Sequence, residues 1–202
     1  MGKVFSRTAQ RYTDILNAAA ELLREGGMGA VTTDRIRQRI NVSLTTVYSH
    51  FENRQEILEE VFRDTHAKFY ATAEYKLQFA RTSEEQLATI IEGIFAEELF
   101  TETHMHIWIA SINYYLYCQG QFSYAPEAHS RAVERTRRLF LELGDKDPDA
   151  SPQFWAFVDG LWLHAALGKG SLSRDKCIDR TFAFTERRLG RKLPRKVKAA
   201  DE

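Results

Sequence analysis

The chain has 202 residues, of which 44% are hydrophobic and 28% charged, and its formal net charge is zero. Length and composition are those of a globular protein with its own core, and the neutral balance excludes the strongly basic charge of many nucleic-acid-binding proteins. Only four prolines and eleven glycines are present, which favours long helices and argues against a sandwich with many turns.

The two cysteines, Cys118 and Cys177, lie far apart in helical patterns. Their number and spacing fit neither a disulfide framework nor a zinc site, and we expect no metal and no cofactor. The sequence contains no apolar segment typical of a signal peptide, and no apolar run near the roughly 18–20 residues of a membrane span. We therefore expect a cytoplasmic protein without membrane contact.

The first predicted helix covers residues 7–26. Its apolar side chains recur at the spacing of one helix face, at Ile15, Leu16, Ala19, Leu22 and Leu23. Gly26 and Gly27 follow this pattern, and glycine accepts the left-handed conformation in which many helices end.

Two short helices are expected next. Thr32 or Thr33 can cap the first of them with a side-chain oxygen. Asn41 interrupts the pattern after about two turns, because Asn tolerates the left-handed conformation of a tight turn. Ser43 can then cap a third helix over residues 44–50.

The rest of the chain has helical patterns throughout, which predicts an all-α fold. Capping and turn signals separate six further helices, which we place at residues 54–79, 83–100, 104–119, 126–143, 152–168 and 173–189. The basic segment from Arg191 onward is expected to be a solvated end.

Three helices joined by tight turns are typical of a helix-turn-helix module, in which the third helix enters the major groove of DNA. Val42, Val47 and Phe51 are expected to face inward. Seven basic and four acidic residues precede residue 51, a local net charge of +3 that suits a module facing phosphates. The outward positions carry groups that can reach base edges or phosphate oxygens, namely Ser43, Leu44, Thr45, Thr46, Tyr48 and His50.

Residues 31–51, with Arg54 and Leu58 after them, resemble the DNA-binding signature of the TetR family of bacterial regulators. The resemblance is dense over residues 10–60. It implies base or groove contacts from Leu44, Thr45 and Thr46, with Ser43 at the start of the helix, and phosphate contacts from Thr33, Tyr48, His50 and Arg54.

Two positions depart from the family's usual pattern. Asn41 stands where the family commonly has Gly, and Asn is the next-best residue for that turn. Arg54 stands where the family commonly has Lys, and Arg still brings a cation to phosphate with a different fork geometry.

The resemblance implies an N-terminal three-helix helix-turn-helix module over residues 1–53 and a larger helical ligand-binding and dimerisation domain over residues 54–202. Two copies on a palindrome make such a module useful, so double-stranded operator DNA and a second copy of the chain are the implied partners. The family dimerises through its last two helices, here residues 152–168 and 173–189. The first of these is apolar over much of its circumference, which requires burial on more than one face.

A second, shorter resemblance concerns a small-molecule effector. Residues 159–167 are similar to a segment of the choline-responsive BetI-type regulators within the TetR family, and residues 105–119 are loosely similar. A quaternary ammonium group is held by aromatic faces, often with a carboxylate nearby, and Asp159 lies within one turn of two tryptophans. The candidate effector-binding residues are Trp108, Tyr114, Tyr115, Trp155, Asp159 and Trp162. These aromatic residues can equally fill the core and the dimer interface.

The expected function is that of a repressor released from a palindromic operator by a small-molecule effector, choline or another organic cation. A TetR-type regulator of an unrelated small hydrophobic ligand, such as a drug or an acyl compound, is the alternative. An α-helical enzyme is disfavoured, because the sequence contains no nucleophile motif, glycine-rich phosphate loop or metal cluster. A further alternative is a structural dimer with a vestigial DNA module, which would not bind the DNA upstream of its own gene.

Overall fold

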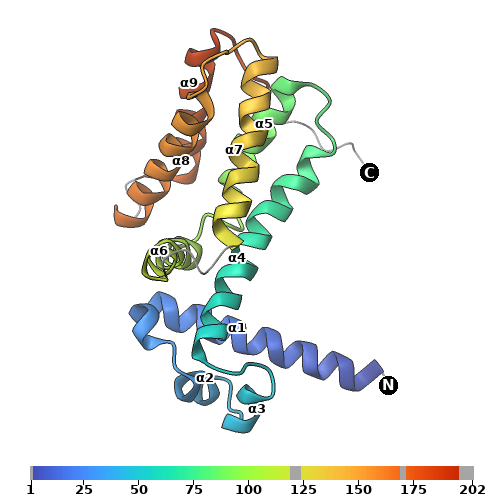
Figure 1. The fold of residues 1–202 in the computed structure, drawn as a ribbon, viewed down its shortest axis with the longest axis vertical. Helices are drawn as coiled ribbons and strands as arrows, with labels where there is room; N and C mark the ends of the chain where they lie inside the picture. The colour runs from blue at the N-terminus through green and yellow to red at the C-terminus, as the bar shows by residue number, and fades with distance from the viewer. Residues whose placement is uncertain (1, 119–123, 169–171, 196–202) are drawn as a thin grey trace. The chain divides into compact units, whose positions relative to one another are not determined.

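The computed structural model describes residues 2–118, 124–168 and 172–195. Over these residues the chain forms α-helices and no strand, so the predicted all-α class is confirmed (Figure 1). None of the described helices is both long and apolar enough to cross a membrane. In chain order the helices are α1 (Gly2–Ala30), α2 (Thr33–Arg39), α3 (Leu44–Tyr48), α4 (Arg54–Leu77), α5 (Ser83–Ile94), α6 (Glu102–Tyr117), α7 (Tyr124–Glu142), α8 (Ala150–Leu167) and α9 (Arg174–Leu189).

The helices form two compact units. The N-terminal unit comprises residues 1–65 and 102–122, and the C-terminal unit comprises residues 66–101 and 123–202. Helix α4 begins in the first unit and ends in the second, whereas α6 belongs to the first because it packs against α1. The domain boundary predicted between residues 53 and 54 stays a prediction. The compact units are divided elsewhere, because a later part of the chain returns to the N-terminal unit.

Local signals end and begin the first helices where the sequence predicts. The backbone leaves helical geometry at Gly26 and Gly27, which has a φ of 66°, before a last turn of α1. The Thr32 hydroxyl accepts a hydrogen bond from the Arg35 backbone N–H (3.2 Å) and caps α2. Asn41 has a φ of 50° and makes the left-handed turn before α3.

Aromatic side chains fill the core of the C-terminal unit. Phe140, Phe154 and Phe182 come from α7, α8 and α9, respectively, and are fully buried. Phe154 packs edge-on against Phe140, with 6.0 Å between the ring centroids. Burying these rings supplies much of the unit's hydrophobic stabilisation.

Helix α5 is shorter than predicted. It begins with a reciprocal capping box, in which Thr82 Oγ1 accepts from the Glu85 N–H (3.1 Å) and Glu85 Oε2 accepts from the Thr82 N–H (3.2 Å). The helix ends at Ile94 rather than near residue 100, yet Phe95 and Leu99 beyond it are buried. The apolar pattern after Ile94 therefore reflects buried turns and not a longer helix.

In the segment after α9, Arg191, Lys192 and Arg195 are exposed, as expected of a solvated end, but Leu193 is not. Gly190 reverses the chain with a φ of 65°, and Leu193 is then buried. The Glu186 carboxylate accepts a hydrogen bond from the Leu193 backbone N–H (3.1 Å). The Arg195 guanidinium lies 3.8 Å from the centroid of the Phe182 ring. Leu193 and these polar contacts together hold the start of a basic segment; residues 196–202 lie outside the described ranges.

Candidate DNA-binding surface and effector site

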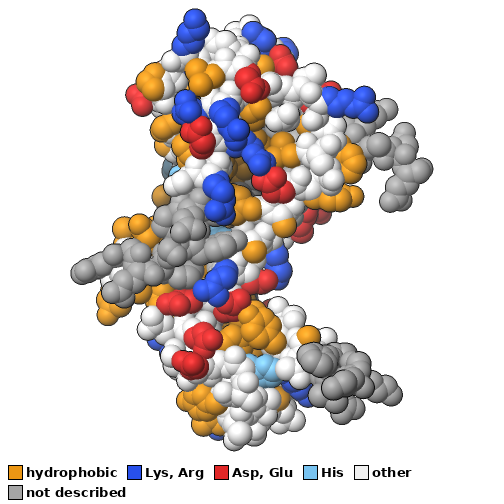
Figure 2. Space-filling model, turned by 45° about the vertical axis from the view of Figure 1, so that its right-hand side comes forward, with side chains coloured by type: hydrophobic (Ala, Val, Ile, Leu, Met, Phe, Trp, Pro, Cys, Tyr) orange, Lys and Arg blue, Asp and Glu red, His pale blue; other side chains and the backbone are white. Residues whose placement is uncertain are grey.

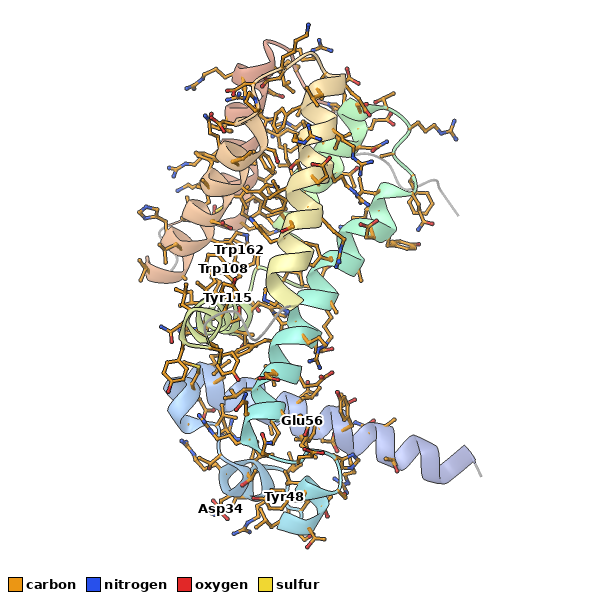
Figure 3. All side chains as sticks on the ribbon, viewed as in Figure 1. Asp34, Tyr48, Glu56, Trp108, Tyr115 and Trp162 are labelled. Carbon is orange, nitrogen blue, oxygen red and sulfur yellow. The ribbon has the colours of Figure 1, made fainter. Side chains whose placement is uncertain are left out.

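Helix α3 presents an exposed face that is fixed by its own capping. Ser43 Oγ accepts a hydrogen bond from the Thr46 backbone N–H (3.0 Å) and lies 2.8 Å from Thr46 Oγ1. Leu44, Thr45 and Tyr48 are exposed, and 50% of Tyr48 is accessible to solvent. Figure 3 labels Tyr48 on α3. Hydroxyl and methyl groups held in this way can read base edges without first being ordered.

The opposite side of α3 is packed firmly against the other helices of the N-terminal unit. Val47 and Phe51 are buried, which confirms that they face inward, whereas Val42 is half-buried. Tyr12 of α1 stacks on the Phe51 ring, with 5.1 Å between centroids and 20° between planes. Ile36 of α2 is also fully buried. The exposed face of α3 therefore stands on a well-packed base.

The local charge of +3 overstates the cations that are available to DNA. Arg39 of α2 makes a two-pronged ion pair with Glu25 of α1, with N–O distances of 2.6 and 2.9 Å. Arg37 pairs with Asp34 at 2.7 Å. Arg35 is exposed and makes no ion pair within the described part of the chain. Arg35 is therefore the cation of α2 that remains free to meet a phosphate.

Two of the remaining predicted phosphate contacts, Thr33 and Arg54, lie at helix starts, and His50 lies in the turn after α3. Thr33 is the first residue of α2, and it and His50 are half-buried. Arg54, at the start of α4, donates from Nε to the Val31 carbonyl oxygen (2.5 Å) and from a terminal nitrogen to the Met28 carbonyl oxygen. Arg54 therefore fastens α4 to the last turn of α1 and to Val31 after it. Its phosphate contact, like those of Thr33 and His50, stays a prediction.

Three of the predicted effector residues lie on α6, in the N-terminal unit. Tyr114 is buried, its hydroxyl donates to Glu59 Oε1 (2.8 Å), and its ring lies 5.4 Å from that of Phe62. Burial and the hydrogen bond to Glu59 raise the pKa of Tyr114. These contacts make Tyr114 part of the packing between α6 and α4. Trp108 and Tyr115 are half-buried on the same helix (Figure 3).

Two others, Trp155 and Asp159, lie one turn apart on α8 in the C-terminal unit. Trp155 Nε1 donates to Thr136 Oγ1 (3.0 Å), which leaves the ring faces for packing, and His129 of α7 meets this ring edge-on at 5.7 Å. Asp159 is half-buried and makes no hydrogen bond or ion pair within the described residues. Burial raises the pKa of Asp159, and the charge of His129 opposes that shift. A desolvated carboxylate costs stability, which makes Asp159 a candidate binding residue.

Trp162 serves the core of the same unit. Its ring stacks on Phe95 at 6.2 Å and meets Phe100 edge-on at 5.5 Å, and only 6% of the residue is exposed. Sequence reasoning identified neither Phe100 nor His129 as a neighbour of these tryptophans. No local signal could have done so, because each comes from a different helix or turn than its partner.

One stripe of the outward face of α8 carries no Asp, Glu, Lys or Arg side chain, and the exposed His164 lies beside it. The stripe runs along Ala156, Gly160, Leu163 and Leu167, and the two leucines are 43% and 70% exposed. A Cβ atom built at Gly160 would meet nothing within 4 Å. An uncharged helix face of this kind is typical of a protein–protein contact.

Two protein families match the chain over separate segments. Residues 15–61 match the bacterial regulatory proteins of the tetR family, and residues 83–190 match the C-terminal part of the BetI-type transcriptional repressors. The HTH-type transcriptional regulator BetI of Escherichia coli K12 is 25% identical over 185 residues, which cover 89% of this chain and 94% of that protein. The fatty acid metabolism regulator protein of Bacillus subtilis is 28% identical over 86 residues, 43% of this chain and 44% of the relative.

Solved structures show the same fold. A regulator from Saccharomonospora viridis, crystallised in complex with choline, aligns with a TM-score of 0.76 at 20% identity and covers 88% of this chain and 96% of its own. A transcriptional regulator from Rhodococcus aligns with a TM-score of 0.74 at 14% identity over 87% of this chain and 96% of that one.

A capped, exposed helix on a three-helix module, followed by a larger helical unit, defines a DNA-binding transcriptional regulator. The chain belongs to the TetR family, and its C-terminal part is of the BetI repressor type. Proteins of this family regulate transcription and are not enzymes; they bind DNA, dimerise and respond to small molecules. The resemblance to the TetR family and its BetI-type branch is thereby confirmed.

Proposed function

We propose that this chain is a homodimeric repressor that binds a palindromic operator through α3 and is released by an organic cation, choline or a close relative. The observation that carries the proposal is the exposed, capped face of α3 on its buried base. Leu44, Thr45 and Thr46 contact base edges in this proposal, with Ser43 holding the start of the helix. The phosphate contacts come from Thr33, Arg35, Tyr48, His50 and Arg54.

Dimerisation follows from the size of the recognition element. Helix α3 has only five residues, so one copy reads too few base pairs for useful affinity, and two copies on a palindrome are needed. The uncharged face of α8, with Leu163 and Leu167, supports a contact with the same face of a second copy. Phe184 of α9 stacks on Phe157 of α8, with 4.6 Å between the ring centroids and 8° between the ring planes, and joins the two helices of the proposed interface.

Asp159 is the observation that favours a cationic effector over an unrelated hydrophobic one. A hydrophobic ligand would leave this half-buried carboxylate without a partner, whereas a quaternary ammonium group would neutralise it and pack on the Trp155 ring. The choline complex of the Saccharomonospora viridis regulator, which shares this fold, is consistent with that chemistry. His129 joins Trp155 and Asp159 as a third group of the proposed site.

Effector binding reaches DNA through α4, the helix that continues from the N-terminal unit into the C-terminal unit. The effector shifts the protein away from the DNA-binding state only by its greater affinity for the other state. A substitution at the effector site should therefore change the response to choline and leave the affinity for DNA in its absence unaltered.

A gel-shift titration with the DNA upstream of the chain's own gene tests this function. We expect a salt-dependent complex that choline dissociates, and a D159N variant that binds the same DNA but no longer responds to choline. Absence of a complex at low salt would remove the assignment of α3. Release by decanoate and not by choline would favour the acyl-ligand alternative.

A further inference from the structure

His129 of α7 lies at the level of Asp159 of α8. The two helices pack together and are joined by the short segment 143–149, so they run in opposite directions. Thr136 Oγ1 of α7 lies 2.5 Å from Ser151 Oγ and accepts a hydrogen bond from Trp155 Nε1 at 3.0 Å. His129 precedes Thr136 by two turns, about 10 Å along α7, and the same distance along α8 leads from the Ser151–Trp155 turn to Asp159.

The His129 ring contacts α8 directly. It meets the Trp155 ring edge-on, with 5.7 Å between the ring centroids and 70° between the ring planes. Trp155 and Asp159 are four residues apart and share a face of α8. His129 is exposed and Asp159 is half-buried, so solvent protons reach the imidazole while the carboxylate beside it is partly desolvated. Their charges interact, since His129 opposes the rise in the pKa of Asp159 that burial causes.

The other ionisable groups of the neighbouring helices can be named. On α8 the second ionisable residue is His164, which is exposed and more than one turn beyond Asp159. On α7 the sequence places Glu127 and Arg131 two residues before and after His129, and residues two apart on a helix do not share a face.

Helix α5, which also packs against α7, ends near the level of His129. The hydrogen bond from Ser83 Oγ to Glu142 (2.5 Å) joins the start of α5 to the end of α7, so the two helices are antiparallel. The charged residue closest to the end of α5 is the half-buried Glu92. Basic and acidic side chains are intermixed on the face of the C-terminal unit that Figure 2 shows, so individual neighbours decide the charge at the site.

A histidine beside a carboxylate makes a cation site sensitive to protons. Histidine is the side chain whose charge ordinarily changes between pH 5 and pH 8. A protonated imidazole next to Asp159 supplies the positive charge that the carboxylate would otherwise take from a ligand. A quaternary ammonium group needs the same negative charge and the Trp155 ring beside it. A proton on His129 and a cationic effector therefore oppose each other.

We propose that His129 sets the affinity of the Trp155–Asp159 site by competing, when protonated, with the organic cation for Asp159. This inference rests on the proposed function, because it takes an organic cation as the effector. Neutral His129 leaves the carboxylate to the cation and keeps its edge against Trp155. Binding of the cation then releases a proton from His129, because linked equilibria are reciprocal. At lower pH the repressor keeps its operator at choline concentrations that release it at pH 8.

Calorimetric titration of the full chain with choline between pH 8 and pH 6, in two buffers of different ionisation enthalpy, tests the proposal. We expect the affinity of the parent to fall at least about threefold, because a free histidine is about three-quarters protonated at pH 6. At pH 6.5 the comparison of buffers should show net proton release on binding.

Two variants separate the charge of His129 from its packing. H129F keeps an aromatic ring against Trp155 but cannot be protonated, and H129Q removes the ring as well. In both, the affinity should change less than about 1.5-fold between pH 8 and pH 6, because the remaining carboxyl titrates mainly below this range. H129F should bind choline at pH 8 within about twofold of the parent, because neither side chain is charged there.

The matched control is H106Q. His106 is also exposed, but it lies on α6 and its Nδ1 is 2.8 Å from the Glu102 carbonyl oxygen of its own helix. This variant should keep the pH dependence of the parent. Unchanged pH dependence in both His129 variants, or an equal loss in H106Q, would overturn the proposal. Choline binding without pH dependence would overturn it and leave the proposed function intact, whereas no choline binding at pH 8 would overturn both.

Discussion

Tyr48 in the N-terminal unit is 50% exposed, whereas Trp162 in the C-terminal unit is 6% exposed and stacks on Phe95. Helix α3 is a single short turn that buries one side, so the residues on its other side necessarily face outward. Helix α8 packs against both α7 and α9, so a large ring on it meets a neighbour from almost any position. An outward side chain on a short helix thus points to a partner, whereas a ring in a bundle first serves stability.

The largest effect should come from the core of the C-terminal unit. Replacing Phe154 with Ala should cost about 3–5 kcal/mol of stability, because a fully buried ring is replaced by a cavity. Chemical denaturation followed by far-UV circular dichroism measures this loss. A cost below about 1 kcal/mol would mean that the C-terminal unit does not depend on its aromatic core for stability.

The next effect concerns the uncharged face of α8. L163R should abolish the dimer and lower operator affinity by about a hundredfold or more, since two half-sites must be engaged together. L141R is the matched control, because Leu141 on α7 is 44% exposed and Leu163 is 43% exposed. Light scattering gives the mass of each variant. Equal behaviour of the two variants would rule out this face as the interface.

A smaller effect is expected on the exposed side of α3. Y48F should leave folding and the dimer intact and weaken the operator complex about tenfold to thirtyfold, because each of two protomers loses a hydroxyl contact worth about 1 kcal/mol. T46A is a less clean test, because Thr46 also contacts the Ser43 cap. Binding at matched salt should be measured by fluorescence anisotropy. Unchanged affinity would mean that α3 does not approach the phosphates as proposed.

The smallest effect is expected at Asp159, where the substitution should raise the stability of the folded protein instead of lowering it. Burial raises the pKa of this carboxyl, so its ionised form destabilises the folded state, and stability falls as pH rises through the folded pKa. D159N should therefore melt at a slightly higher temperature than the parent at pH 7. The difference should vanish as pH falls to about 4, where an aspartate becomes protonated.

Differential scanning calorimetry of D159N and the parent across this pH range checks the sign. A stabilising substitution that also abolishes the response to choline is what a binding residue predicts, because function keeps a costly group in place. A D159N variant that is less stable at pH 7 would mean that Asp159 has a structural role instead.

Short-range chemistry in the sequence determined most of the N-terminal unit. The caps at Thr32 and Ser43 and the left-handed turn at Asn41 act over three or four residues, so they can be read directly from the chain. The inward positions of Val47 and Phe51 follow from the same helical period. For this reason, the all-α class and the order of the helices could be predicted over the described residues.

Only the tertiary structure decided what the long-range neighbours do. It assigned Trp162 to the core with Phe95 and Phe100, tied Arg54 to the carbonyl groups before α2, brought His129 against Trp155, and returned α6 to the N-terminal unit. A hydrophobic pattern records that a side chain is buried, but it does not record which distant side chain lies beside it. That pairing depends on how the helices pack, and it separates a core aromatic residue from one that can hold a ligand.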